Sequence, residues 1–196
     1  MADEANRLAN LRLERDQRDY LAAHVLLRVA FRKGRGTDLD APLADRAGWS
    51  LTHSEGFVAC ALAVDSRHAI GVDAEPLEAA ARLETLADTF MSATEMGLLP
   101  SDPDGRARRM VEIWTAKEAV LKALGEGFSG EEGFGVLAEL ESTPLGTLDD
   151  WGTISVRDAR TGSAYSAWGR WVEGHALMVV AEGNEGTPRL EGVTLR

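Results

Sequence analysis

The stretch Trp114-Thr-Ala-Lys-Glu-Ala-Val-Leu-Lys-Ala-Leu-Gly125 predicts a helix, because Ala, Leu, Lys and Glu dominate it and a glycine ends it. Trp114, Glu118 and Lys122 recur at i, i+4 and i+8 and form one stripe of this helix. The opposite side is apolar and carries Ile113, Ala116, Val120, Ala123 and Leu124. By geometry alone, Glu118 and Lys122 are the ordinary ion pair of an exposed helix face.

The composition is that of a soluble globular protein, with 196 residues, 44% of them hydrophobic and 27% charged. The formal net charge of −11 argues against general binding to nucleic acid or to an anionic membrane. Cys60 is the single cysteine, which excludes an internal disulfide and a cysteine zinc site. No stretch reaches the roughly 20 apolar residues of a membrane span, and no signal peptide is visible, so we expect a cytoplasmic protein.

The periodicity predicts helix, strands, helices and strands in that order, which indicates an α+β fold. A first helix is expected at about 3–31, with an apolar face around Leu21 and Val25, and a second at 77–90. A short helix should begin at the capping box Ser92-Ala-Thr-Glu95, and the helix around Trp114 follows it. Strands are expected at 57–64, 69–75, 152–157, 163–173 and 175–181, with hairpin turns at Thr161-Gly162 and Glu173-Gly174. Because the same order occurs twice, we expect two related lobes, 1–76 and 77–182, with a tail at 183–196.

A pair of acids and a segment with one histidine between two hydroxyl residues are the polar groups most suited to catalysis or ligand binding. Asp73 and Glu75 lie at i and i+2 of a strand, so both carboxylates face the same way, and a hard ion such as Mg²⁺ suits an oxygen-only pair. Two acids on a solvent-facing strand edge are the alternative. Thr52-His53-Ser54, at a loop-to-strand transition, can donate to phosphate oxygens, or it is a turn cluster with a surface histidine. The chain has no Walker A motif, no Gly-x-Gly-x-x-Gly after a predicted strand and no Gly-x-Ser-x-Gly elbow before a helix.

The order of these motifs resembles the 4′-phosphopantetheinyl transferases, and most closely the single-chain pseudodimeric type that activates nonribosomal peptide and polyketide synthases. The likeness covers roughly residues 7–127. Its motifs are Thr-His-Ser54, Gly-Val-Asp-Ala-Glu75, Phe-Met-Ser-Ala-Thr-Glu95 and Trp-Thr-Ala-Lys-Glu-Ala-Val-Leu-Lys122. The resemblance implies two similar α+β lobes with coenzyme A bound in the cleft between them.

The resemblance also implies roles for individual residues. Asp73, Glu75 and Glu118 match the acids that organise Mg²⁺ at the coenzyme A diphosphate. Glu118 and Lys122 are the expected catalytic residues, with Glu118 as the base for the acceptor serine, directly or through water, and Lys122 on a phosphate. His53 matches a histidine on the 3′-phosphate. The remaining cofactor-binding candidates are Thr52, Arg28, Arg18 and Lys117.

The expected activity is Mg²⁺-dependent transfer of 4′-phosphopantetheine from coenzyme A to a serine of an apo acyl or peptidyl carrier protein, with release of 3′,5′-ADP. We expect a monomer that acts in secondary metabolite biosynthesis. The expected carrier contact consists of Arg106, Arg108 and Arg109 with an apolar patch around Phe90, Met91 and Met110. The alternatives are a non-catalytic coenzyme A or carrier-protein binding module derived from this fold, and an acidic interaction protein with coincidental motifs.

The sequence departs from the family pattern at three places. The first helix starts almost at Met1, where relatives have a strand and a loop, so we expect a first lobe that is shortened or completed by a partner. A basic Gly-Lys-Pro-like segment is replaced by residues 34–42, where Arg35 or Arg46 could substitute. Ala74 stands where relatives have a bulky residue between the two acids.

Overall fold

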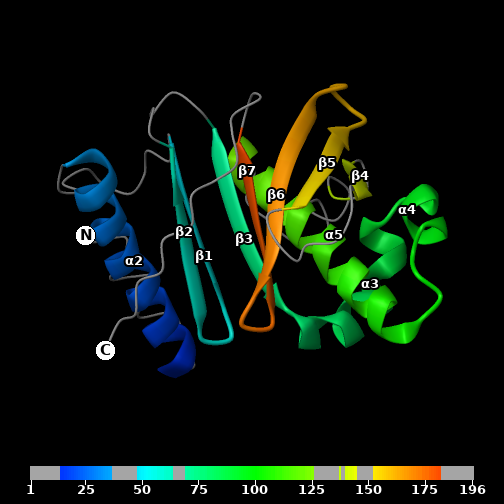
Figure 1. The fold of residues 1–196 in the computed structure, drawn as a ribbon, viewed down its shortest axis with the longest axis horizontal. Helices are drawn as coiled ribbons and strands as arrows, with labels where there is room; N and C mark the ends of the chain where they lie inside the picture. Colours follow the sequence, from blue (N-terminus) through cyan, green and yellow to red (C-terminus); the bar gives the residue numbers. More distant parts are fainter. Residues whose placement is uncertain are drawn as a thin grey trace.

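The computed structural model describes residues 14–36, 48–63, 69–125, 137, 140–144 and 152–181, and they form helices and antiparallel sheets (Figure 1). In chain order the elements are α2 (Glu14–Arg35), β1 (Trp49–Ser54), β2 (Phe57–Leu62), β3 (Ile70–Pro76), the 3-10 helix η1 (Leu77–Ala79), α3 (Ala80–Phe90), α4 (Ala93–Gly97), α5 (Pro103–Leu124), β4 (Leu140–Pro144), β5 (Gly152–Asp158), β6 (Ala164–Val172) and β7 (His175–Ala181). The predicted mixture of helices and antiparallel strands is confirmed. The expected tail at 183–196 lies outside the described residues.

The larger sheet has five strands in the order β3-β7-β6-β5-β4, with each neighbouring pair antiparallel. The turn between β6 and β7 is the predicted Glu173-Gly174 pair, whose φ angles of 50° and 80° suit a tight hairpin turn. Gly162, with φ 75°, lies in the predicted turn between β5 and β6. Both predicted hairpins are confirmed.

β3 joins the two halves of the chain. It pairs with β7 along its whole length, from Ile70 opposite Ala181 to Pro76 opposite His175. A lobe boundary at residue 76 therefore separates β3 from the sheet to which it belongs. The division into two similar lobes stays a prediction.

The smaller sheet is a hairpin that the sequence analysis did not predict. β1 and β2 pair from Trp49 opposite Leu62 to Ser54 opposite Phe57. Glu55 and Gly56, with φ angles of 47° and 87°, form the two-residue turn between them. The expectation that Thr52-His53-Ser54 marks a loop-to-strand transition is wrong, because this Glu-Gly turn lets the strand continue through Ser54.

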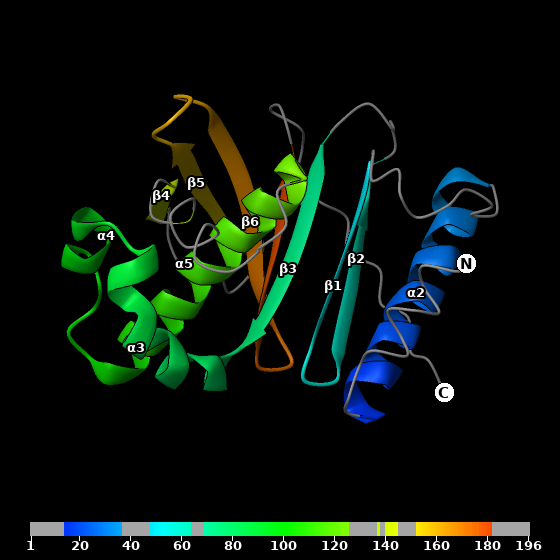
Figure 2. The same ribbon diagram turned by 180° about the vertical axis from the view of Figure 1, so that it is seen from behind.

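A polar seam joins the hairpin to the larger sheet. β1 lies beside β3 (Figure 2), although the two strands belong to separate sheets. Ser50 Oγ accepts a hydrogen bond of 3.0 Å from the backbone N–H of Val72. An apolar cluster also packs between the two sheets, and its buried members are Ala61, Val72, Ala74, Leu177 and Val179.

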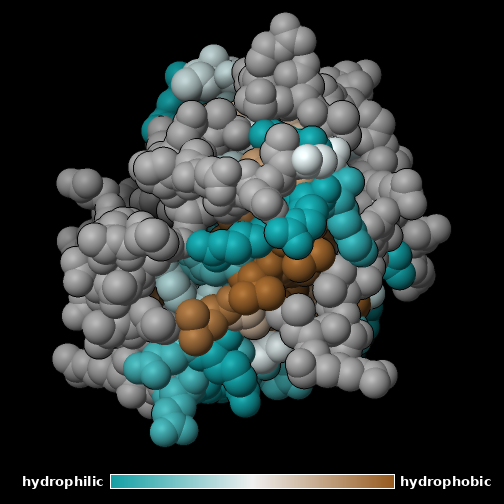
Figure 3. All heavy atoms as spheres, turned by 90° about the vertical axis from the view of Figure 1, so that its left-hand side faces the viewer, coloured by the Kyte–Doolittle hydropathy of each residue, from teal (hydrophilic) through white to brown (hydrophobic). Residues whose placement is uncertain are grey.

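α2 covers the outer side of the hairpin through a different face from the one that the sequence indicated. Ala23, Leu27 and Phe31 are buried at the spacing i, i+4 and i+8, whereas Leu21 and Val25 are 49% and 46% exposed. Figure 3 shows apolar side chains as a stripe between hydrophilic ones on this side of the molecule. The prediction that Leu21 and Val25 form the buried face is wrong, because α2 packs on the hairpin through the side that carries Ala23 and Phe31.

α5 lies across the face of the five-stranded sheet that points away from the hairpin, and α3 and α4 lie on the outer side of α5 (Figure 2). It begins with Asp102 as N-cap and Pro103 in its first turn, and it ends at Gly125 in the left-handed conformation, as predicted. Every side chain from Met110 to Leu121 is buried. The interpretation of Trp114 and Glu118 as part of an exposed helix face is therefore wrong, since α5 has protein on both sides.

Candidate active site

The two faces of β3 have different neighbours. Val72 and Ala74 pack toward the hairpin, so the alternating residues Gly71, Asp73 and Glu75 share the face toward α5. A Cβ added to Gly71 would lie 1.9 Å from the carbonyl oxygen of Ala119 in α5. The predicted common orientation of the two acids is confirmed, and the glycine allows the strand and helix backbones to touch.

The stripe of α5 that carries Glu118 meets this face of β3. Gly71 lies against Ala119, and the Lys122 Nζ atom is 2.7 Å from Asp73 Oδ1. The Trp114 indole lies close enough to the Glu75 carboxylate to lower its pKa. The helix therefore runs antiparallel to the strand, with Trp114 at the Glu75 end and Lys122 at the other end.

Asp73 is fixed by two donors on one oxygen. Its Oδ1 atom accepts from Thr52 Oγ1 at 3.0 Å and from Lys122 Nζ at 2.7 Å. Its second oxygen, Oδ2, and the Oε1 oxygen of Glu118 are both buried, and neither has a hydrogen-bond partner in the described part of the chain. Buried carboxylate oxygens without donors are costly, which indicates a missing cation or donor.

The electrostatics of the three acids point the same way. Burial raises the pKa of Glu118 to about 7, and the charges of Asp73 and Glu75 add to this effect against the opposing charges of Lys122 and Arg82. Burial and the charge of Asp73 also raise the pKa of Glu75, while Arg82, Trp114 and Lys122 lower it. The cluster therefore has more negative charge than its two neighbouring cations balance.

The residues present fit a hard divalent cation. The donors are carboxylate oxygens only, and two of these oxygens lack a partner among the residues that the structure describes. No three His, Cys, Asp or Glu side chains in the described ranges converge into a complete ligand set. Mg²⁺ commonly takes one or two carboxylates and completes its shell with water and substrate phosphates, so Asp73, Glu118 and Glu75 are the residues that would hold it.

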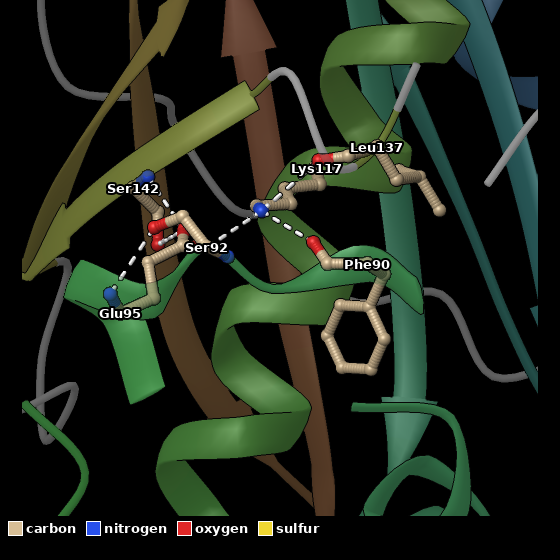
Figure 4. A network of polar contacts seen from close by, with 6 residues as sticks. All are labelled: Phe90, Ser92, Glu95, Lys117, Leu137 and Ser142. Carbon is tan, nitrogen blue, oxygen red and sulfur yellow. Dashed lines mark hydrogen bonds and ion pairs between the residues drawn. The ribbon is translucent and has the colours of Figure 1, made fainter. Parts of the chain in front are cut away.

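Lys117 has a structural position, although it precedes Glu118 directly. Its Nζ atom is fully buried and donates to the Phe90 carbonyl at 2.6 Å, to Glu95 Oε2 at 2.7 Å and to the Leu137 carbonyl at 3.0 Å (Figure 4). These three acceptors match the three donors of an ammonium group. The expectation that Lys117 binds the cofactor is corrected, because its ammonium group is enclosed by protein.

Glu95 completes this buried network. It forms the predicted capping box with Ser92, with bonds of 2.8 Å and 3.2 Å in the two directions. Its Oε1 atom also accepts from the backbone N–H and the hydroxyl of Ser142, each at 2.7 Å. One carboxylate therefore joins α4, α5 and β4 (Figure 4).

Of the other predicted cofactor-binding residues, Thr52 contacts the acid cluster, whereas His53, Arg28 and Arg18 lie on β1 and α2. Thr52 is buried and uses its hydroxyl proton on Asp73, so it positions that acid instead of facing a ligand. His53 is exposed on the opposite side of β1, which is the side toward α2. Arg28 donates to the His24 carbonyl, and Arg18 is 3.9 Å from Asp19. The roles of His53, Arg28 and Arg18 at a nucleotide stay predictions.

Two arginines have roles that the sequence did not reveal. Arg35, a suggested substitute for the missing lysine segment, donates to the carbonyls of Gly48 and Ala63 and so fastens α2 to the open end of the hairpin. Arg46, the other suggested substitute, lies outside the described residues. Arg82 of α3 lies 3.7 Å from Glu75 at the acid cluster. No motif marks Arg82, because its contact depends on where α3 begins.

Comparison with known proteins identifies the family of the chain. Residues 69–180, which run from β3 into β7, match the model of the 4′-phosphopantetheinyl transferase superfamily. The chain belongs to this superfamily. The matched range covers more than half of the 196 residues and includes all three acids and Lys122.

A curated relative supports the assignment to the 4′-phosphopantetheinyl transferase superfamily. The chain is 34% identical over 110 residues to the 4′-phosphopantetheinyl transferase HetI of Nostoc sp. (strain PCC 7120 / SAG 25.82 / UTEX 2576). This match covers 55% of the present chain and 46% of HetI, so it spans less than half of that relative. In addition, none of the described helices is both long and apolar enough to cross a membrane.

Proposed function

We propose that the chain transfers the 4′-phosphopantetheine group of coenzyme A to a serine hydroxyl of an apo carrier protein and releases 3′,5′-ADP. The observation that carries this proposal is Glu118, a buried acid with a pKa raised to about 7, placed between Asp73 and Glu75 beside Lys122. Family membership provides the reaction class, and the acid cluster provides groups suited to it.

Glu118 is suited to act as the general base. A base is most effective when its pKa is near the working pH, and burial brings Glu118 to that range. In the proposed step the serine oxygen forms a bond to the phosphorus that carries pantetheine, and its proton passes to the Glu118 carboxylate, directly or through water. The bond from that phosphorus to the bridging oxygen breaks, and 3′,5′-ADP leaves with the electron pair.

Lys122 and Asp73 are suited to hold the charged diphosphate in place. Lys122 is partly exposed and already lies in the cluster, so its ammonium group can reach a phosphate oxygen next to Asp73. When bound by the acids, Mg²⁺ supplies positive charge that neutralises the diphosphate and the developing charge on the leaving group. Thr52 keeps the Asp73 carboxylate in one orientation through its hydrogen bond.

The apolar part of the expected carrier contact is corrected, and its basic part stays a prediction. Phe90, Met91 and Met110 are buried, so they form no apolar surface patch, and that expectation is wrong. Arg106 and Arg109 are paired with Glu84 and Glu112 at 3.0 Å each. Carrier-protein recognition, a monomeric state, a cytoplasmic location and a role in secondary metabolism stay part of the proposal.

One experiment tests the proposed activity. The protein is incubated with Mg²⁺, coenzyme A and an apo carrier protein, and the carrier is weighed intact by mass spectrometry. We expect a gain of one phosphopantetheine group, and a loss of rate on the order of 10²-fold or more in Glu118→Gln. Glu84→Gln, which neutralises an exposed glutamate on α3, is the matched control and should keep the rate.

The outcomes separate this activity from the alternative. Binding of coenzyme A without any mass gain on the carrier would indicate the non-catalytic binding module. The absence of both binding and transfer would contradict the superfamily activity for this chain. Equal rates for Glu118→Gln and Glu84→Gln would show transfer in which Glu118 has no part.

A further inference from the structure

Arg82 lies beside the acid cluster on a platform formed by Trp114. Its guanidinium carbon is 5.6 Å from the centre of the Trp114 ring, within the range of a cation–π contact. Trp114 is itself buried and meets the Phe90 ring edge-on, with ring centres 5.1 Å apart. A buried, packed ring therefore supports the guanidinium group at a fixed place.

The contact of Arg82 with Glu75 leaves much of its guanidinium group available. One terminal nitrogen is 3.7 Å from Glu75 Oε1, which is an ion pair too long for a hydrogen bond. The arginine side chain is 53% exposed. A guanidinium group has five N–H donors in a planar fork, so a second acceptor can bind without displacing the Trp114 contact.

Arg82 and Lys122 lie at opposite ends of the acid cluster. Lys122 is paired with Asp73 at one end, and Arg82 with Glu75 at the other. Each cation therefore faces one of the two strand acids of the cluster. A diphosphate placed over the three acids would lie between these two cations.

We propose that Arg82 is a further phosphate-binding residue of the site, which contacts the diphosphate of the nucleotide substrate from the α3 side. This inference rests on the proposed function. The planar fork of arginine matches two phosphate oxygens, whereas the Lys122 ammonium group binds as a point charge. Glu75 holds Arg82 near the cluster until the diphosphate takes over part of its donors.

Binding of coenzyme A, measured by calorimetry with Mg²⁺ and without a carrier protein, tests this role. We expect Arg82→Gln to weaken the binding of coenzyme A about tenfold, as for loss of one charge-assisted contact. Arg82→Lys should recover only part of the affinity, because it keeps the charge and loses the fork. Arg106→Gln, which breaks a comparable exposed pair with Glu84, should stay within twofold of the wild type.

A second ligand identifies the phosphate. Dephospho-coenzyme A lacks the 3′-phosphate and keeps the diphosphate, so Arg82→Gln should weaken its binding by the same factor. Loss of the effect with this ligand would place Arg82 at the 3′-phosphate and overturn the assignment. A merely structural role for Arg82 on Glu75 predicts that binding of Mg²⁺ alone weakens as much as binding of coenzyme A, and that result would also overturn it.

Kinetics separate this inference from the proposed function. If the wild type transfers the group and Arg82→Gln keeps its affinity for coenzyme A, the role of Arg82 is wrong and the function stands. A rise in KM for the carrier alone would place Arg82 at the acceptor protein and contradict the inference. If the wild type neither binds coenzyme A nor transfers it, the proposed function fails and the role of Arg82 fails with it.

Discussion

Glu118 is held at the centre of the site by surroundings that oppose its charge. It is 9% exposed, its Oε1 oxygen has no hydrogen-bond partner in the described residues, and Asp73 and Glu75 lie beside it. Such an arrangement reduces the stability of the protein in the absence of a cation and makes the carboxylate more basic. The same burial that suits Glu118 to the proposed proton transfer therefore weakens the metal-free fold.

This conflict predicts a pH dependence of stability. Because the folded pKa of Glu118 is raised to about 7 from an ordinary value of 4.5, the folded state binds the proton more tightly than the unfolded state does. The contribution is complete below the unfolded pKa and is lost as the pH rises through about 7. At roughly 1.4 kcal/mol per pKa unit, we expect a loss on the order of 3 kcal/mol between about pH 4.5 and pH 8.

Urea unfolding of the metal-free protein in a chelating buffer measures this loss. Glu118→Gln should remove most of the pH dependence and should be more stable than the wild type at about pH 8. Glu84→Gln should keep the slope, because Glu84 is an exposed residue paired with Arg106. A slope that is unchanged in Glu118→Gln would show that another group is responsible.

The contact between β3 and α5 fixes the spacing of the two elements that carry the acid cluster. Gly71 lies directly against the α5 backbone at Ala119 and Ala123. These two residues directly follow Glu118 and Lys122 in the chain. A methyl group there would lie 1.9 Å from the Ala119 carbonyl oxygen and 2.8 Å from the Ala123 nitrogen. Backbone atoms cannot give way as a flexible side chain can, so the strand would have to move away from the helix.

Gly71→Ala should therefore be strongly destabilising, by several kcal/mol on the scale of overpacked cores, or should prevent folding. Gly97→Ala is the matched control, since nothing lies within 4 Å of its added Cβ and it is in helix α4. Alanine is the better helix former, so this variant should be neutral or slightly more stable. Chemical denaturation of both proteins measures the difference, and equal stabilities would contradict the contact.

The buried pair of Lys117 and Glu95 connects three other elements around α5. Removing one partner of a buried ion pair leaves an uncompensated charge, so Lys117→Met should cost about 3–5 kcal/mol. The double variant with Glu95→Gln should recover part of that loss, since it removes the remaining charge. Additive losses in this double-mutant cycle, measured by urea unfolding, would show that the two residues do not interact.

Over the whole molecule, helix caps, helix ends and strand faces were predictable from the sequence. The contacts that each helix or strand makes with distant parts of the chain were not. The capping box at Ser92, the end of α5 at Gly125 and the shared face of Asp73 and Glu75 follow from short-range rules, and the structure confirms them. The burial of Lys117 depends on residues far apart in the chain, so periodicity could not show it. For the same reason one helix considered alone gave no sign that α5 has protein on both sides.

The site follows the same division. The order of the motifs indicated the acids and Lys122, which the fold brings together. It gave no indication of Arg82, whose place depends on how η1 turns the chain after Pro76. It also placed Thr52 at the ligand, whereas the newly found strand β1 turns that hydroxyl toward Asp73.

The seam between β1 and β3 has a consequence for motion. Where one strand meets the next through a side chain, as Ser50 meets Val72, the hairpin and α2 can separate from the five-stranded sheet without breaking a backbone ladder. Amide exchange at Val72 should therefore report this separation, and Ser50→Ala should accelerate it while amides between β6 and β7 keep their rates. Thr52 belongs to the hairpin and holds the Asp73 carboxylate of β3. Separation of the hairpin from the larger sheet would therefore release this carboxylate from its fixed orientation.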